Sequence, residues 1–379
     1  MEELTVNETK MMKINFTNED WDRVELATMA WWAGELNRPL VNLAVTDPIP
    51  PEKFSLPLHS YWSNYPLDMP AGDIIDRFEP LCAATHFYGD AFPWHWLNFG
   101  PGIAAGFLGA NVHSVYEPSE TVWFSPPREV RLEDLHLTYD ATNIWWLRVK
   151  ELTSALADRY GGNLAVSHTD LGGNLDILAS FRGTQELLFD LLDHPEEVDR
   201  LTRAITQLWL RYYDELDAII RPACRGTSCW TPVWSSGKTY MMQSDFAYMI
   251  SPAMFERFVL PDLTACCNHL DHSFYHLDGK GQIRHLDLLL SIGRLRGIQW
   301  IPGDGQPPPH EWLPLLKRIR DGGKLCQVFV SPEGARTIVK NLGGRGFLFV
   351  IQPVSASDFQ NPEEAQAFLK TLAEEDCSL

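Results

Sequence analysis

The amino-acid sequence predicts an α/β protein, a single (β/α)₈ TIM barrel over residues 36–379 that follows an N-terminal extension of residues 1–35. Four strand–helix units succeed one another from residue 273 to residue 375, a rhythm that is typical of a parallel sheet covered by helices. Four earlier apolar segments bring the number of expected strands to eight, and 379 residues suit one large barrel. A doubly wound open sheet is the alternative, but no GxGxxG follows an early strand.

The first part of the chain combines short apolar segments with Pro-rich or Gly-rich loops. Residues 19–34 have the pattern of an opening helix, whereas the Pro-rich residues 48–75 are expected to be irregular. Gly161 is placed to end a helix within 131–160, and Pro195 to separate two long helices. The expected strands of this part are 38–45, 93–99, 163–169 and 228–234, and a further helix is expected at 77–87.

The second part of the chain is more regular. Ser251 is a suitable N-cap and Pro252 a suitable first residue for a helix over 251–270. Short apolar and aromatic runs then alternate with amphipathic helical patterns. The expected strands are 273–279, 297–303, 324–330 and 346–351, and the helices that follow them are 285–292, 310–323, 332–344 and 361–375.

Composition and charge exclude several classes of protein. Asp and Glu number 50 against 31 Lys and Arg, and the net charge of −19 repels nucleic acid and anionic membranes. No segment approaches the roughly 20 apolar residues that cross a bilayer, and the acidic N-terminus lacks the apolar core of a signal peptide. Seven cysteines without a CxxC pair indicate reduced thiols, so we expect a cytoplasmic protein.

A pair of polar residues at the end of the fifth expected strand is the strongest candidate for chemistry. Strand alternation puts His276 and Asp278 on one face, where they can bind a metal or share a proton. A structural His–Asp hydrogen bond is the alternative interpretation. Asp170, at the end of the third strand, is the third candidate catalytic residue, because barrel enzymes carry their active groups at these ends.

Further polar and aromatic residues are expected to bind the substrate. The 14 tryptophans indicate a cavity for a flat or apolar small molecule. Asp245 is expected in a loop at the mouth of the barrel, with solvation at the surface as the alternative. The remaining candidates, all near expected strand ends, are Asn98, His168, Asp176, Trp230, Trp234, Gln299 and Trp300.

Three blocks of the sequence are similar to those of a known superfamily. They are RGTQELLFDLLDHPE at 182–196, SD at 244–245 with MISPAMF at 249–255 and LP at 260–261, and HLDG at 276–279. Together, over roughly residues 140 to 375, they resemble the uroporphyrinogen decarboxylase superfamily, which also contains corrinoid:thiol methyltransferases. The resemblance implies the same barrel fold and one of two chemistries.

The decarboxylase branch binds a polycarboxylated porphyrin-like substrate through arginines of its first strand and loop. Here Arg38 is followed by no other arginine through position 50, and the NLGHG segment of that branch is replaced by IQPVSASDF at 351–359. A polycarboxylate needs paired arginines. The strand ends instead offer aspartates, so decarboxylation is an alternative and not the leading hypothesis.

The methyltransferase branch binds zinc through a His-x-Cys on the fifth strand and a Cys near the eighth. Zinc lowers the pKa of an acceptor thiol there. His276 matches that histidine, but Asp278 stands where the first Cys is expected, and the eighth strand has none. Cys326 lies on the seventh strand. The resemblance therefore implies a site with oxygen and nitrogen ligands for zinc or another divalent metal, or no metal.

The leading hypothesis is an enzyme of one-carbon (methyl) transfer that acts with a corrinoid (methylcobalamin) protein or on a methylated small molecule. His276 and Asp278 would be its metal ligands or its acid and base. The other hypotheses are a glycoside hydrolase, with Asp170 or Asp176 opposite Asp278, and a non-catalytic ligand-binding barrel.

A lid is expected within 48–75 or 112–130. Aromatic residues at 31–32 and 61–65 look exposed and favour a homodimer.

Overall fold

The computed structural model of the chain describes residues 14–54, 58–352, 359 and 361–376, and it has a mixed α/β fold. The largest sheet has the strand order β2-β1-β11-β10-β9-β8-β7, in which all neighbours are parallel except β2 and β1. Its strands are β1 (Leu40–Thr46), β2 (Thr85–Gly89), β7 (Thr239–Met242), β8 (His272–Asp278), β9 (Leu295–Ile301), β10 (Leu325–Val330) and β11 (Phe347–Ile351).

A second, two-stranded parallel sheet pairs β3 (Trp94–Trp96) with β6 (Ala165–Ser167). Six parallel strands of the large sheet and these two give the eight that the sequence predicts. The predicted parallel α/β architecture is thus confirmed, whereas closure into one continuous barrel stays a prediction. Among the described residues the two sheets share no strand ladder, and one isolated bridge, Ser167 to Ser228, connects β6 with the segment before β7.

β1 and β3 do not pair, because both edges of β1 are already used. β2 pairs antiparallel with β1 from Asn42 opposite Gly89 to Thr46 opposite Thr85, while β11 takes the other edge of β1. Because a strand edge can pair only once, no edge of β1 is left for β3. β2 is therefore the edge strand of the large sheet, at the edge of β1 that a pairing with β3 would need.

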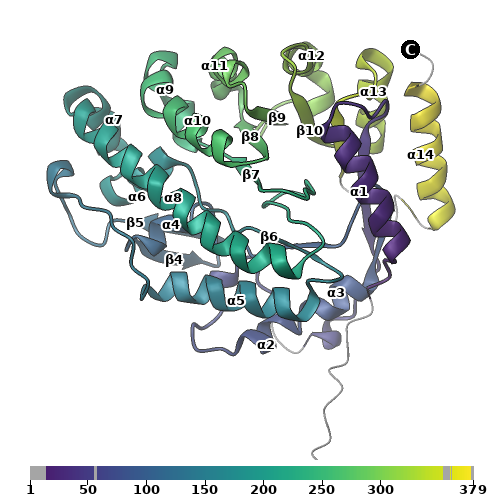
Figure 1. The fold of residues 1–379 in the computed structure, drawn as a ribbon, viewed down its shortest axis with the longest axis horizontal. Helices are drawn as coiled ribbons and strands as arrows, with labels where there is room; N and C mark the ends of the chain where they lie inside the picture. The colour runs from purple at the N-terminus through teal and green to yellow at the C-terminus, as the bar shows by residue number, and fades with distance from the viewer. Residues whose placement is uncertain (1–13, 55–57, 353–358, 360, 377–379) are drawn as a thin grey trace, which may run out of the picture.

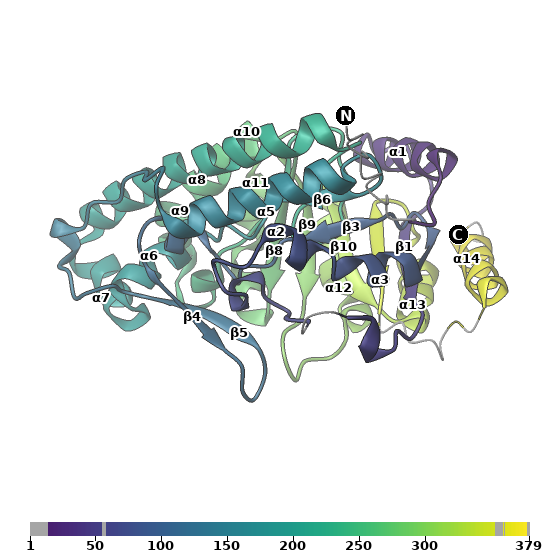
Figure 2. The ribbon, with the colours of Figure 1, turned by 90° about the horizontal axis from the view of Figure 1, so that it is seen from below.

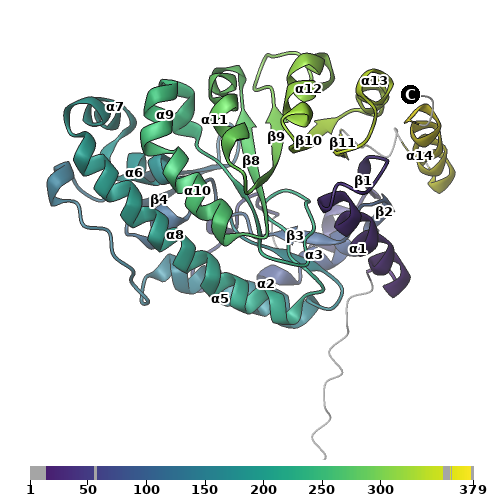
Figure 3. The same ribbon diagram turned by 45° about the horizontal axis from the view of Figure 1, so that its top comes forward.

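Fourteen α-helices are defined among the described residues, and most lie outside the strands (Figure 1). They are α1 (Asn18–Trp32), α2 (Ala71–Ile75), α3 (Phe78–Ala84), α4 (Ala104–Phe107), α5 (Ile144–Tyr160), α6 (Asn174–Arg182), α7 (Thr184–Asp193), α8 (Pro195–Ala223), α9 (Pro252–Phe258), α10 (Leu260–His269), α11 (Leu286–Ser291), α12 (Leu313–Asp321), α13 (Pro332–Leu342) and α14 (Pro362–Asp376). Helices α9, α11, α12 and α13 form a row along the outside of β8 to β11 (Figure 3). Within the described part of the chain, no helix has the length and apolar character that crossing a membrane requires.

Three sequence predictions of local structure are wrong. Residues 228–234 form no strand, because Pro232 interrupts the run and Thr227 bridges back to Ser235; the fourth strand is β7 instead. The expected helix 77–87 ends at Ala84, since the following Thr, His, Phe and Tyr favour the strand β2. The expected helix 251–270 is two helices, with Pro261 in the first turn of the second.

Two segments that were considered for a lid have regular structure in part. Residues 112–130 contain most of a hairpin of β4 (Asn111–Val115) and β5 (Thr121–Ser125), which projects from the molecule in Figure 2. Residues 48–75 contain short 3₁₀ turns and α2, and 55–57 lie outside the described residues. Whether either segment moves as a lid stays a prediction.

Helix α1 places its aromatic residues inside the fold. Trp31 and Trp32 are 1% and 2% exposed, and the ring of Trp32 stacks on His272 at 4.2 Å. Trp62 and Tyr65 are buried as well. The aromatic residues that suggested a homodimer are therefore core residues, and the reason given for that expectation is wrong.

Candidate functional site

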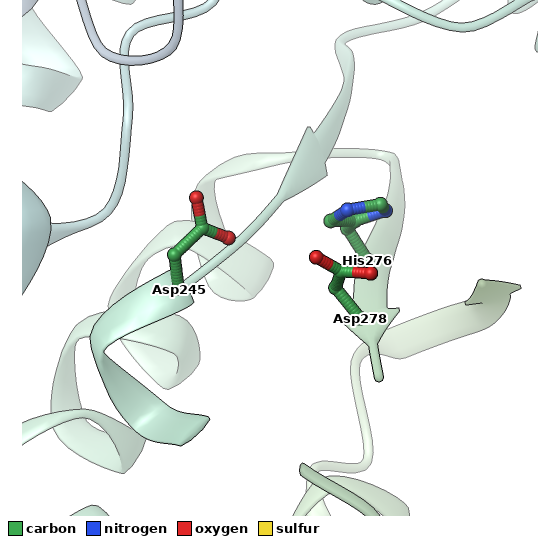
Figure 4. A group of neighbouring side chains, drawn as sticks. All are labelled: Asp245, His276 and Asp278. Atoms are coloured by element: carbon green, nitrogen blue, oxygen red, sulfur yellow. The ribbon is translucent and has the colours of Figure 1, made fainter. Parts of the chain in front are cut away.

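Three of the predicted residues meet at the carboxyl end of the parallel sheet. His276 and Asp278 come from the end of β8, and Asp245 comes from the 3₁₀ turn Asp245–Met249 that follows β7 (Figure 4). Their ligand atoms all lie within 4.8 Å of one another. β8 pairs with β9 without interruption from Phe274 to Asp278, so His276 and Asp278 point to the same side, as the alternation of the sequence predicted.

The side-chain amides of Gln299 and Gln327 orient the ring of His276. Its Nδ1 is hydrogen-bonded to Oε1 of Gln299, the neighbouring residue on β9. Gln299 Nε2 donates to Oε1 of Gln327 at 2.7 Å, so the other end of the amide, its Oε1, accepts from Nδ1–H. In that tautomer the lone pair of Nε2 is left for a proton or a metal ion.

Two further aspartates beside this group have pKa values near neutrality. Burial raises the pKa of Asp170 to about 7, and the negative charge of Asp245 adds to the rise, while the N–H of Gly172 at 2.9 Å opposes it. Burial and the charge of Asp245 also raise the pKa of Asp176 to about 7, against the backbone N–H of Phe246 at 2.7 Å. Both carboxyl groups can therefore gain or lose a proton near pH 7.

The four carboxyl groups Asp170, Asp176, Asp245 and Asp278 make the site electronegative. In the part of the chain that the structure describes, no lysine or arginine forms an ion pair with any of them. The pKa of Asp245 is raised by burial and by Asp278, and His276 counteracts the rise. This arrangement attracts cations and repels a polycarboxylated ligand.

A cavity of about 570 Å³ lies next to the site. Its lining comes from β1, the segment between β2 and β3, β3, β10, the end of β11 and the loop after Ser228. The residues are Asn42, Ala44, Ala91, Phe92, Trp94, Trp96, Trp230, Thr231, Pro232, Phe329, Val350, Ile351 and Gln352. Trp230 belongs to both places, since its ring also stands edge-on to His276 at 4.9 Å.

Thiol ligands do not complete the group in the described residues. Cys229 and Cys326 are buried, and burial raises the pKa of each thiol to about 12, so both stay protonated at neutral pH. Two carboxylates and one imidazole are, however, a suitable donor set for a divalent cation. Asp245, His276 and Asp278 thus fit a metal ion that prefers oxygen and nitrogen ligands.

Of the other predicted residues, Gln299 and Trp230 join the site, and Asp176 reaches it from the first turn of α6, not from a strand. His168 is fully buried with its ring stacked on Tyr213 of α8, and burial lowers its pKa. Asn98 binds the carbonyl of Ser60 and thereby fastens the loop beside β3.

Trp234 and Trp300 do not line the cavity. Trp300 alternates with Gln299 along β9 and packs outward against Trp312, with 5.1 Å between the rings. Trp234 belongs to a separate buried cluster with Trp21 and Phe92 beneath α1. Both are core residues: the indole of Trp300 lies on the helix-facing side of β9, and Trp234 is buried in that cluster from an irregular segment.

Sequence reasoning missed residues that complete the site. Tyr240 of β7 places its hydroxyl 2.7 Å from the N–H of Leu171, next to Asp170. Thr231 donates to Gln327 and Trp96 walls the cavity. The apolar and aromatic run of β7, directly before Asp245, is the signal that would have identified Tyr240 and given Asp245 a strand end.

Comparison with known proteins supports the fold. No protein-family model matches the sequence, and no curated protein matches it. Among solved structures, a methyltransferase from Methanosarcina mazei aligns over 93% of this chain and 98% of its own, with a TM-score of 0.58 and 12% identity. A B12-independent methionine synthase from Shewanella sp. W3-18-1, in complex with selenomethionine, aligns over 72% of this chain and 77% of its own, with 11% identity. Its TM-score of 0.38 is too low to support an argument.

Proposed function

We propose that the chain is an enzyme that transfers a methyl group to or from a small molecule, with Asp245, His276 and Asp278 at the centre of its active site. The observation that carries the proposal is the convergence of these three side chains within 4.8 Å. The fold that the chain shares with the methyltransferase from Methanosarcina mazei supports it, as does the independent resemblance of three sequence blocks to a superfamily that contains corrinoid methyltransferases.

In this proposal the three side chains hold a divalent cation, zinc or a metal of similar preference. When bound, such an ion lowers the pKa of a heteroatom on the methyl acceptor. His276 would offer Nε2, since Gln299 already holds Nδ1. A corrinoid protein would supply or take up the methyl group, and the enzyme would work in the cytoplasm.

The chain's own residues would manage the proton of the acceptor. Asp170 and Asp176, with pKa values of about 7, can take up that proton and release it again. Trp230 would shield the reacting atoms from water on the side of the cavity. Decarboxylation of a porphyrin-like polycarboxylate is disfavoured, because four carboxyl groups that no described lysine or arginine neutralises would repel such a substrate.

Metal titration tests the proposal. Calorimetry with Zn²⁺ and Mn²⁺ should give one ion per chain. His276→Ala or Asp278→Asn should lower the metal affinity more than about 100-fold, because loss of a residue that only orients a ligand already lowers it about 10–100-fold. The exposed residues His113 and Asp287 provide matched controls, since H113A and D287N should bind as the unaltered protein does.

The second measurement is spectroscopic. Mixing the protein with methylcobalamin and candidate thiol, amine and phenol acceptors should produce the spectral change of demethylated cobalamin, and D278N should abolish it. Binding of no metal together with no change for any acceptor would contradict the proposal.

A further inference from the structure

The chemistry of the cavity beside Trp230 restricts what it can hold. Five of its lining residues are aromatic: Phe92, Trp94, Trp96, Trp230 and Phe329. Among the described residues that line it, none is Asp, Glu, Lys, Arg or His. A carboxylate inside such a lining would lose its water without gaining a partner, so the cavity selects against carboxylates. The aromatic faces attract a cation, so a cation is the competitor of a neutral ring for this cavity.

The polar lining residues are largely occupied by the protein. Asn42 Nδ2 donates to the carbonyl of Pro232 at 3.0 Å, and Thr231 Oγ1 donates to Gln327 Oε1 at 3.0 Å. Only Gln352, at the end of β11, is exposed among the polar lining side chains. Trp96 Nε1 is buried and has no hydrogen-bond partner among the described residues, so the wall offers an N–H donor. Recognition of a molecule that enters therefore depends mainly on shape and stacking, with few directional hydrogen bonds.

The position of Trp230 connects this cavity to the electronegative group. One edge of its ring meets His276 at 4.9 Å between centroids, and Trp96 lies 6.3 Å away on the cavity side. A planar molecule that packs against these indoles from the cavity side would extend a substituent past Trp230 toward Asp278. The cavity volume of about 570 Å³ is within the range of small-molecule sites and suits one or two fused rings.

We propose that the cavity binds the flat, uncharged aromatic ring of the molecule on which the enzyme acts, and that the reacting substituent of that molecule points past Trp230 to the Asp245–His276–Asp278 group. This assignment of a substrate class rests on the proposed function. In the alternative, the four carboxyl groups alone select a small cation. An aromatic ring on the ligand would then contribute nothing to its affinity.

Calorimetric titration with four probes separates these possibilities. Indole is a neutral ring, indole-3-acetate adds a negative charge, cyclohexanol is neutral but not aromatic, and tetramethylammonium is a cation without a ring. Indole should bind saturably, and the other three probes should bind at least about tenfold more weakly. A tenfold lower affinity corresponds to the loss of roughly one good aromatic contact. Equal or tighter binding of cyclohexanol or tetramethylammonium, or no binding of indole, would overturn the inference.

Two variants locate the ring. Ala44→Trp introduces an indole from an exposed position of the cavity wall, and Trp96→Ala removes a wall; both should weaken indole binding about tenfold. Trp123→Ala, on the projecting β4–β5 hairpin, is the control and should change nothing. Indole binding that neither A44W nor W96A alters would place the ring elsewhere and contradict the inference.

Metal binding distinguishes this inference from the proposed function. A44W should still bind Zn²⁺, and D278N should still bind indole. If Zn²⁺ binds as expected but indole does not, the substrate class is wrong while the active site stands. If indole binds and Zn²⁺ does not, the cavity stands and the metal site is wrong.

Discussion

At the scale of single residues, the candidate site depends on the groups that orient the ring of His276 and on the carboxyl groups that surround it. Gln299 lies directly opposite on β9, and it is fully buried. A buried amide that spans two partners fixes both its own orientation and the imidazole tautomer. The pairing of His276 with Asp278 was predictable from their spacing, whereas the role of Gln299 follows only from the strand register.

Replacing Gln299 should weaken metal binding without removing a ligand. Gln299→Leu takes away the acceptor for Nδ1–H, and we expect Zn²⁺ affinity to fall about 10–100-fold. Gln299→Glu keeps an acceptor and should restore most of the affinity, while Gln207→Leu, exposed on α8, serves as control. Equal affinities for Q299L and the unaltered protein in calorimetry would refute the orienting role.

The raised pKa of Asp170 makes stability dependent on pH. A carboxyl group with a pKa of about 7 in the folded state and 3.8 as its ordinary value binds more protons when folded, so the metal-free protein should lose stability as pH rises from about 4 through 7. The loss from Asp170 is at most about 4 kcal/mol. Urea unfolding at pH 5 and pH 8.5 should show it, and Asp170→Asn should reduce the difference. A D170N variant with the full pH dependence would argue against this assignment.

At the scale of elements, the sequence predicts the second half of the chain well and the first half less well. The strands β8 to β11 and the helices after them appear within one to three residues of their predicted bounds at most ends, because each strand is a short apolar run between helical patterns. β7 was misplaced since 228–234 is equally rich in aromatic residues, and only the pairing with β8 distinguishes the two segments. β2 was taken for helix because its pairing with the distant β1 is a tertiary effect.

Helix α1 should contribute strongly to stability through its buried face. Trp32 stacks on His272 and donates from Nε1 to the carbonyl of Trp234 at 2.9 Å. Trp32→Ala should lower the free energy of unfolding by about 3–5 kcal/mol in chemical denaturation, as for other buried aromatic residues. Met29→Ala, half exposed on the same helix, should change it by less than about 0.5 kcal/mol. Similar losses for W32A and M29A would mean that α1 is not docked.

At the scale of the whole molecule, the sequence predicts the parallel α/β architecture and residues of the candidate site, but not the course of the sheet. Seven of the eight parallel strands follow from local patterns, and β7 is the exception. The meeting of Asp245 with His276 and Asp278 could be predicted only by knowing that β7 pairs with β8. The burial of Trp300 depends on which side of β9 faces the helices, and that of Trp234 on how an irregular segment packs under α1. The similarity to the Methanosarcina mazei methyltransferase extends over nearly the whole chain, which agrees with this architecture.

Hydrogen exchange should reflect the division of the molecule into a parallel sheet and a projecting hairpin. Backbone amides of β8, β9 and β10, paired on both sides, should exchange slowest, whereas those of β4 and β5 should exchange much faster because their hairpin is two-stranded and exposed. Mass spectrometry of peptides after deuterium labelling measures both. Protection of the hairpin equal to that of β9 would contradict the expectation.

The antiparallel pairing of β2 with β1 has an evolutionary consequence. Since β2 and β11 satisfy both edges of β1, the stretch from residue 47 to residue 84 can lengthen, shorten or change in composition without breaking any ladder hydrogen bond of the large sheet. The segment directly after β2 supplies Ala91 and Phe92 to the cavity. Relatives of this protein are therefore free to diverge in this part of the chain while they keep the residues of the candidate site.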